Sequence, residues 1–123
     1  MPTQRQLRVN NLLREEIANI VLRDLEDPDL GFVTITGIEV TADLRDAKVF
    51  VSVLGDAEAK RDSMRALIRG RHFIHGLLQD RLDLRRTPKL IFQLDETAEL
   101  AAHLSQVLRQ VAEQDKPQDE PAE

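Results

Sequence analysis

The sequence predicts a single α+β domain in which helices cover one face of a three-stranded, mixed sheet. The chain has 123 residues, 41% of them apolar, which is enough for one buried core and too few for two. Four segments repeat apolar residues at helical spacing and three short segments alternate them, in the order α-β-β-α-α-β-α. Because a β-αα-β passage normally crosses one face of a sheet, the helices are expected on one side.

The first helix is expected to begin after Thr3 and to end near Asp24. Thr3 and Gln6 have the spacing of a capping box, and apolar residues from Val9 to Val21 recur at helical intervals. Residues 26–31 then have the composition of a turn, because their proline disfavours helix at the residue before it and their glycine tolerates positive φ.

Two strands of a hairpin are expected next. Residues 32–41 are rich in β-branched side chains, but their apolar positions change from odd to even numbers across Gly37. A β-bulge at Gly37 would keep both halves of this strand facing the core. After a short connection, residues 47–53 alternate regularly, so the sequence predicts that this second strand pairs with the first.

The next two helices are expected to meet at a bend. An apolar stripe begins at Met64, lapses over residues 69–72 and resumes at Phe73, so the joint is placed at Gly70, where a bend costs least. A third strand follows over residues 89–94.

A last helix is expected to begin near Asp95, with acidic residues at the positive end of its dipole. Its apolar stripe runs from Leu100 to Val111 and is the most regular in the chain. The domain is therefore predicted over residues 1–112. Residues 113–123 contain two prolines and five carboxylates and are expected to be a disordered acidic tail.

The charge is distributed in alternating blocks, although the whole chain carries a net charge of −5. Residues 1–23 and 61–89 are basic, with net charges of +2 and +5, whereas residues 24–60 and 90–123 each carry −6. The start of the chain lacks the apolar run of a secretory signal, and no stretch is long enough to span a bilayer. We therefore expect a cytosolic protein. We also expect it to be monomeric when free.

The residues favour no enzymatic or metal chemistry. The chain has no cysteine, and its three serines lie outside any nucleophile motif or phosphate-binding loop. His72 and His75 are three residues apart, as metal ligands on a helix can be, but the neighbouring Arg71 repels a cation. We expect no catalytic residues, no metal and no other cofactor.

The segment around the helix joint is the strongest candidate for a binding site. Residues 61–89 hold eight basic and only three acidic side chains, and a bend would expose free N–H groups of a helix N-terminus beside them. Guanidinium groups bind phosphate well, so we expect a phosphate-binding surface, with the first helix as a second basic element. The candidate residues are Arg5, Arg8, Arg65, Arg69, Gly70, Arg71, His72, His75, Arg81, Arg85, Arg86 and Lys89. The alternative is a protein-interaction module whose acidic faces bind a basic partner while these residues are merely solvated.

Four sequence segments resemble the bacterial ribosome-binding factor A family, over about residues 4–110. They are R-x-x-R-V-N-x-L-x-R-E-E-I-A from Arg5, DPDLGFVTITGIEVTADLRDAKVFVSVLG from Asp27, L-R-R-T-P-x-L from Leu84 and F-x-x-D from Phe92. The element order is also that of a type II KH domain, but the usual GXXG loop is missing.

The resemblance implies both a fold and a function. The family's Ala-x-Gly kink aligns with Gly70-Arg71-His72, where His72 stands in place of the usual glycine. The implied function is that of a non-enzymatic factor that binds the small (30S) ribosomal subunit. Such a factor promotes late maturation of 16S rRNA, including its 5′ region, and its loss causes cold sensitivity.

Overall fold

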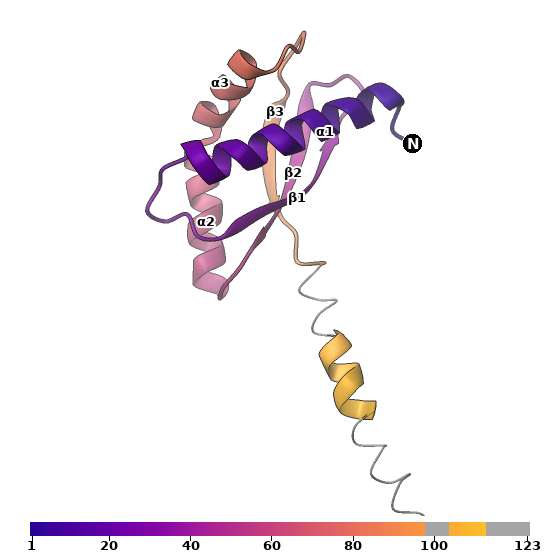
Figure 1. The fold of residues 1–123 in the computed structure, drawn as a ribbon, viewed down its shortest axis with the longest axis vertical. Helices are drawn as coiled ribbons and strands as arrows, with labels where there is room; N and C mark the ends of the chain where they lie inside the picture. The colour runs from indigo at the N-terminus through magenta and orange to yellow at the C-terminus, as the bar shows by residue number, and fades with distance from the viewer. Residues whose placement is uncertain (98–103, 113–123) are drawn as a thin grey trace, which may run out of the picture.

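The structure, a computed structural model, describes residues 1–97 and 104–112. Its helices and strands follow the predicted order (Figure 1). They are α1 (Gln4–Asn19), a π-helical turn η1 (Ile20–Asp24), β1 (Val33–Val40), β2 (Asp46–Val53), α2 (Ala57–Arg69), α3 (Arg71–Arg81) and β3 (Lys89–Leu94). Residues 104–112 are helical as well.

Helix α1 begins with the predicted capping box. The Thr3 hydroxyl accepts the Gln6 backbone N–H at 3.1 Å, and the Gln6 side chain accepts the Thr3 N–H at 2.8 Å. Both contacts satisfy N–H groups that have no partner inside the helix. The η1 turn continues α1 to Asp24, where the sequence predicted the end of the helix.

The sheet has the strand order β1-β2-β3, with β1 antiparallel and β3 parallel to β2. The register of β1 shifts between Ile35 and Gly37, so Thr36 is not paired with any residue of β2 in the register, although its hydroxyl donates to the Phe50 carbonyl oxygen at 3.2 Å. Ile35 and Ile38 are consequently both buried on the same face. This arrangement confirms the predicted β-bulge and the mixed sheet.

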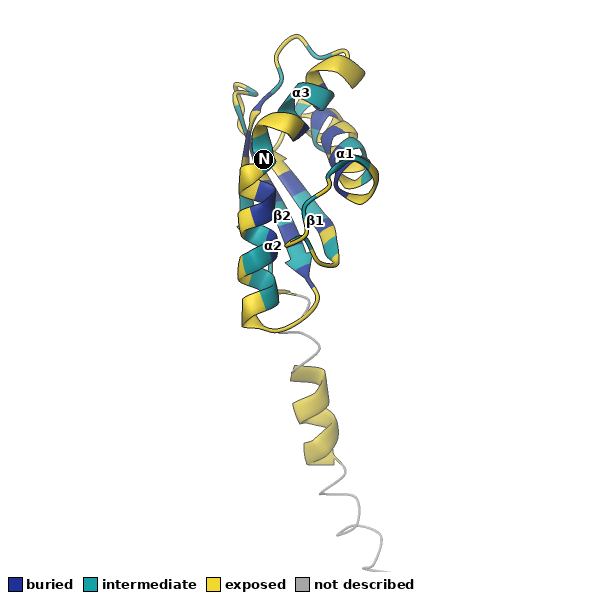
Figure 2. Ribbon diagram, turned by 90° about the vertical axis from the view of Figure 1, so that its left-hand side faces the viewer, coloured by how far each residue is buried: buried dark blue, intermediate teal, exposed yellow. Residues whose placement is uncertain are grey.

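All three helices that precede β3 pack on one face of the sheet. Helix α1 lies alongside β1, and α2 and α3 meet end to end (Figure 1). The buried residues lie between these helices and the sheet, as the burial colours show (Figure 2). Their fully buried members include Leu13, Ile17, Leu67, Leu78 and Leu90. The predicted two-layer α+β fold is confirmed.

The joint between α2 and α3 lies at Gly70, as predicted, but glycine is needed there for close packing. The φ of Gly70 is −85°, which other residues adopt, so a positive φ does not explain it. A Cβ atom at this position would lie 2.7 Å from Leu25 Cδ1 and 3.4 Å from the carbonyl oxygen of Ala66. The Leu25 side chain, directly after η1, therefore lies so close to the joint that it must shift to admit a side chain at this position.

Substitution of Gly70 should consequently destabilise the protein in proportion to side-chain size. Gly70→Val adds methyl groups where Leu25 already lies and is expected to cost about 1–3 kcal/mol, whereas Gly70→Ala should cost less because the end of the Leu25 side chain can shift. Urea unfolding measures both values. If Leu25→Ala does not relieve the defect of Gly70→Val, contact with Leu25 is not its cause.

Asp95, directly after β3, accepts hydrogen bonds from the chain segment that follows it and from β1. Its carboxylate accepts the Thr97 N–H at 2.9 Å and the Thr36 hydroxyl at 2.8 Å, and these hydrogen bonds, with that of the Thr97 backbone the largest, lower the pKa of Asp95. In residues 104–112 the apolar stripe is exposed, from Val107 at 39% to Leu108 at 68% (Figure 2). The start of the predicted stripe and the predicted disordered tail, residues 113–123, lie outside the described residues.

Candidate nucleic-acid interface

The parallel pairing of β2 and β3 brings two distant loops together. Both strands begin at the same edge of the sheet, where Asp46 pairs with Lys89. The Lys89 N–H donates to the carbonyl oxygen of Arg45 at 2.8 Å, which fixes the β1–β2 connection beside the α3–β3 connection. Two cavities open along this edge, and Arg86 lines both of them.

The first cavity, called here the His75 cavity, is lined by basic side chains and contains no carboxylate. It has a volume of about 350 Å³. The His75 ring Nε2 lies 3.2 Å from the carbonyl oxygen of Thr87, which places the ring against the α3–β3 connection. Its lining residues are Arg45, Arg71, His72, His75, Arg86, Thr87, Lys89 and Leu90. A site with this many cations and no anion suits a phosphate group.

The N-terminus of α3 adds a second positive element at the same place. Helix α3 follows Gly70 directly, and no side chain caps its first turn. The first N–H groups of the helix therefore keep their capacity to bind an anion, and the helix dipole favours one. Arg71 and His72 belong to this turn and also line the His75 cavity.

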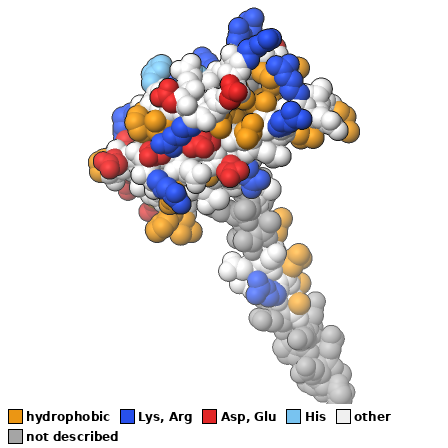
Figure 3. All heavy atoms as spheres, turned by 45° about the horizontal axis from the view of Figure 1, so that its top comes forward, with side chains coloured by type: hydrophobic (Ala, Val, Ile, Leu, Met, Phe, Trp, Pro, Cys, Tyr) orange, Lys and Arg blue, Asp and Glu red, His pale blue; other side chains and the backbone are white. Residues whose placement is uncertain are grey.

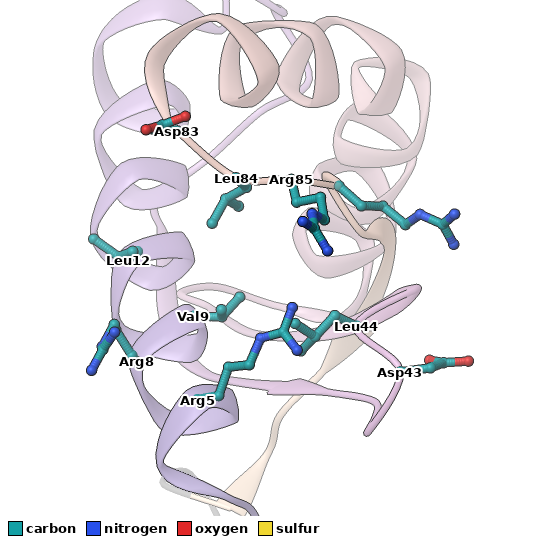
Figure 4. A pocket seen from close by; sticks show the side chains of 10 residues that line it. Arg5, Arg8, Val9, Leu12, Asp43, Leu44, Asp83, Leu84 and Arg85 are labelled. Carbon is teal, nitrogen blue, oxygen red and sulfur yellow. The ribbon is translucent and has the colours of Figure 1, made fainter.

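The second cavity, called here the Arg5–Arg85 cavity, lies between α1 and the two loops. It has a volume of about 490 Å³. Arg5 and Arg85 point into it from opposite sides, over a floor that includes Val9, Leu44 and Leu84 (Figure 4). Its remaining lining residues are Arg8, Leu12, Asp43, Asp83 and Arg86. In the space-filling view, Lys and Arg side chains surround an apolar patch (Figure 3).

Most cations of these cavities lack a carboxylate partner among the described residues, in contrast to some of the other predicted site residues. Within the described part of the chain, no hydrogen bond or ion pair holds Arg5, Arg71, Arg85 or Arg86. Arg45, which the sequence did not single out, makes only a 3.8 Å contact with Asp43. These guanidinium groups therefore have donors available for a ligand.

Arg69 and Arg81, by contrast, are occupied by carboxylates of the α1–β1 segment. Arg69 Nη2 donates to Asp27 at 2.9 Å and to Asp29 at 2.9 Å. Arg81 Nη1 donates to Glu16 at 3.1 Å and to Asp24 at 2.8 Å. These contacts tie α2 and α3 to the chain around η1, so both arginines have a structural role that the linear charge pattern did not reveal.

The contact between Asp27 and Arg69 predicts an acid-dependent loss of stability. The hydrogen bond from Arg69, followed by that from the Asp29 N–H, holds the pKa of Asp27 below its ordinary value. This contribution is complete above the unfolded-state pKa, about 3.9, and is lost as pH falls through the lower folded-state pKa. Wild type should therefore melt above Asp27→Asn at neutral pH, and the gap should close in strong acid. If the difference in melting temperature stays constant with pH, it arises from packing and not from the contact between Asp27 and Arg69.

The structure thus brings together eight of the twelve predicted site residues. Arg5, Arg8, Arg85 and Arg86 line one cavity, and Arg71, His72, His75, Arg86 and Lys89 line the other. Arg65, Arg69, Gly70 and Arg81 line neither.

The sequence analysis missed Arg45 and the apolar floor. Arg45 follows Asp43 and precedes Asp46, so its local charge pattern gave no signal. Leu44 and Leu84 have the pattern of ordinary loop residues, and only the strand pairing brings them to the same cavity. No group of three or more metal-binding side chains occurs in residues 1–97 and 104–112. In the same residues, no helix has the length and apolar character of a membrane span.

Comparison with known proteins gives a consistent result. The model of the family described as ribosome-binding factor A matches residues 5–108. A ribosome-binding factor A of Desulfitobacterium hafniense is 41% identical over 109 residues, which are 89% of this chain and 87% of the relative. That of Thermomicrobium roseum is 44% identical over 109 residues, 89% of this chain and 84% of the relative.

Solved structures agree with the sequence relatives. The crystal structure of ribosome-binding factor A from Thermus thermophilus superposes with a TM-score of 0.64 at 26% identity, covering 72% of this chain and 93% of that one. A homology model of the Thermus thermophilus factor, fitted into the cryo-EM map of its complex with the 30S subunit, gives a TM-score of 0.59 at 26% identity. It covers 71% of this chain and 91% of its own.

Proposed function

The chain belongs to the ribosome-binding factor A family, and we propose that it binds the small ribosomal subunit through the surface formed by its two basic cavities. The observation that carries this proposal is the convergence of cations from α1, the β1–β2 connection, α3 and the α3–β3 connection at one edge of the sheet. Among the described residues, the side chains of Arg5, Arg71, Arg85 and Arg86 have no hydrogen-bond or ion-pair partner. A Thermus thermophilus relative has been placed in a complex with the 30S subunit, which supports the same partner here.

The ligand on the subunit is the 16S rRNA. Phosphate contacts provide most of the affinity of such surfaces, and the His75 cavity has the cations and the helix N-terminus for them. The described residues include few aromatic side chains near this surface, so stacking on aromatic rings contributes little. The protein acts as a monomer and without catalysis or a cofactor.

Binding of this kind would promote late maturation of 16S rRNA, including its 5′ region. A protein that holds an RNA backbone in one arrangement favours the conformers compatible with that arrangement. RNA helices that pair incorrectly rearrange more slowly in the cold, so the requirement for such a factor should increase at low temperature.

The alternative, an acidic protein-binding module, is less well supported by the contacts. Asp24, Asp27, Asp29 and Glu16 are engaged by Arg69 and Arg81 within the domain. These four carboxylates are therefore partly neutralised, whereas Arg5, Arg71, Arg85 and Arg86 have no carboxylate partner among the described residues.

Competition by RNA distinguishes the two functions. Purified small subunits should bind the protein, and 16S rRNA stripped of ribosomal protein should displace it. Displacement by a mixture of ribosomal proteins but not by the RNA would establish the protein-binding alternative. If the chain does not bind subunits at all at low salt, the proposed function is wrong.

A further inference from the structure

We propose that the Arg5–Arg85 cavity binds one unpaired nucleotide of the RNA, with the base on the apolar floor and the phosphate between the two guanidinium groups. The inference rests on the proposed function and goes beyond it, because it assigns different tasks to the two cavities. The His75 cavity would bind backbone only, whereas the Arg5–Arg85 cavity would require a base that has left its stack.

The composition of the cavity carries the proposal. Val9 is buried and Leu44 and Leu84 are half-buried, so the floor is apolar. Arg5 and Arg85 lie over this floor from opposite sides (Figure 4), and neither has a partner among the described residues. A phosphate alone needs no apolar floor, and an apolar side chain needs no pair of guanidinium groups. A nucleotide has both parts, and planar guanidinium groups also stack on bases.

The acidic residues at the rim do not oppose a phosphate in the cavity. Asp43 and Asp83 line the cavity but point away from its centre (Figure 4). The Asp43 carboxylate accepts the Thr41 hydroxyl at 2.6 Å and the Arg45 N–H at 3.1 Å, so it is held in the β1–β2 connection. The interior therefore presents apolar surface and positive charge.

The backbone at Leu44 is consistent with a built site. Its φ is +60°, the one positive value at a non-glycine residue in the described chain. Such a conformation is costly for a branched side chain and persists where surrounding contacts enforce it. Here the Leu44 N–H donates to the Thr41 carbonyl oxygen at 2.9 Å, and the result is a leucine side chain presented on the cavity floor.

Size and continuity favour a nucleotide within a longer strand. A volume of about 490 Å³ lies in the range of small-molecule sites. Arg86 lines both cavities, so an RNA backbone can pass from one to the other without leaving positive surface. A base in a duplex is held in its stack and cannot enter, so the ligand is a single-stranded segment.

The test compares RNA with and without bases. Full-length protein is titrated with an eight-nucleotide single-stranded oligoadenylate, and with an abasic oligonucleotide of the same length and charge, at one salt concentration. Wild type should bind the base-bearing strand about 10-fold more tightly. Equal affinity for the two strands would overturn the proposal, because a purely electrostatic surface does not distinguish them.

Variants test whether a preference for base-bearing RNA depends on this cavity. Leu84→Ser makes the floor polar without a change of charge and should reduce the preference to less than 2-fold while affinity for the abasic strand is kept. Arg85→Gln, at an exposed position, should weaken the binding of both strands. It provides a second readout if Leu84→Ser lowers the melting temperature too far for a binding measurement. Arg65→Gln, outside both cavities, is the control and should retain the preference.

Two results separate this proposal from the proposed function. If wild type binds small subunits and is displaced by 16S rRNA but shows no base preference, the nucleotide site is wrong and the function stands. If the preference persists in Leu84→Ser, or if Arg85→Gln binds both strands as tightly as wild type, the nucleotide binds elsewhere and the assignment to this cavity is wrong.

Discussion

Replacement of Arg71, Arg86 and Lys89 by glutamine should lower the affinity for small ribosomal subunits by about 100-fold or more at physiological salt. The three side chains line the His75 cavity and are exposed or half-buried, with no partner in the described chain. Each charge-assisted hydrogen bond to phosphate contributes about 1.5–3 kcal/mol, so the loss of three contacts is large even where they are not additive. Thermal stability should change little, because these three side chains make no hydrogen bond or ion pair among the described residues, and the substitutions leave the backbone contacts intact.

The salt dependence of binding tests whether these side chains contact phosphate, and a matched variant serves as the control. Each lost phosphate contact should flatten the plot of log affinity against log salt by about 0.7 to 0.9. Arg14, Arg61 and Arg65 are exposed and lie outside both cavities, so their joint replacement removes the same charge elsewhere. If this control triple weakens binding as much as the first, affinity follows net charge and not the site.

Ile74→Ala should destabilise the protein by about 2–5 kcal/mol, a large part of the stability of a domain of this size. Ile74 is fully buried in the first turn of α3, where its N–H donates to the Gly70 carbonyl oxygen at 2.9 Å. Truncation leaves a cavity below the joint, where the surrounding helices and sheet cannot close it completely. Urea unfolding measures the loss.

Two neighbouring changes calibrate that result. Ile74→Val removes one methylene group and should cost about 0.5–1.5 kcal/mol. Phe73→Ala removes a larger side chain, but Phe73 is 48% exposed, so its cost should be well below that of Ile74→Ala. A Phe73→Ala variant as unstable as Ile74→Ala would show that α3 presents a different face to the core than the structure describes.

Elements defined by local interactions could be predicted from the sequence. The capping box of Thr3 and Gln6 joins residues three apart, and the bulge at Gly37 is visible as a change of phase within one strand. The joint at Gly70 appears as a gap in one apolar stripe. The reason for that glycine could not be predicted, because Leu25, whose side chain would have to shift to admit a Cβ there, is far away in the sequence.

The site itself depended on the tertiary structure. By sequence alone, Arg69 and Arg71 are equivalent members of one basic block, yet the fold pairs Arg69 with Asp27 and Asp29 and leaves Arg71 beside a cavity. Arg45 and Arg5 come from acidic or distant segments and join the site only because β3 runs parallel to β2 and α1 lies alongside β1.

The sequence by itself therefore determined the order of the elements, their ends and the presence of a basic segment, because periodicity, caps and charge are local properties of the chain. Only the tertiary structure decided which cations are free to bind a ligand. That outcome depends on which carboxylates the strand pairing and helix packing bring within hydrogen-bond distance of each guanidinium group, and such long-range neighbours leave no trace in the local pattern.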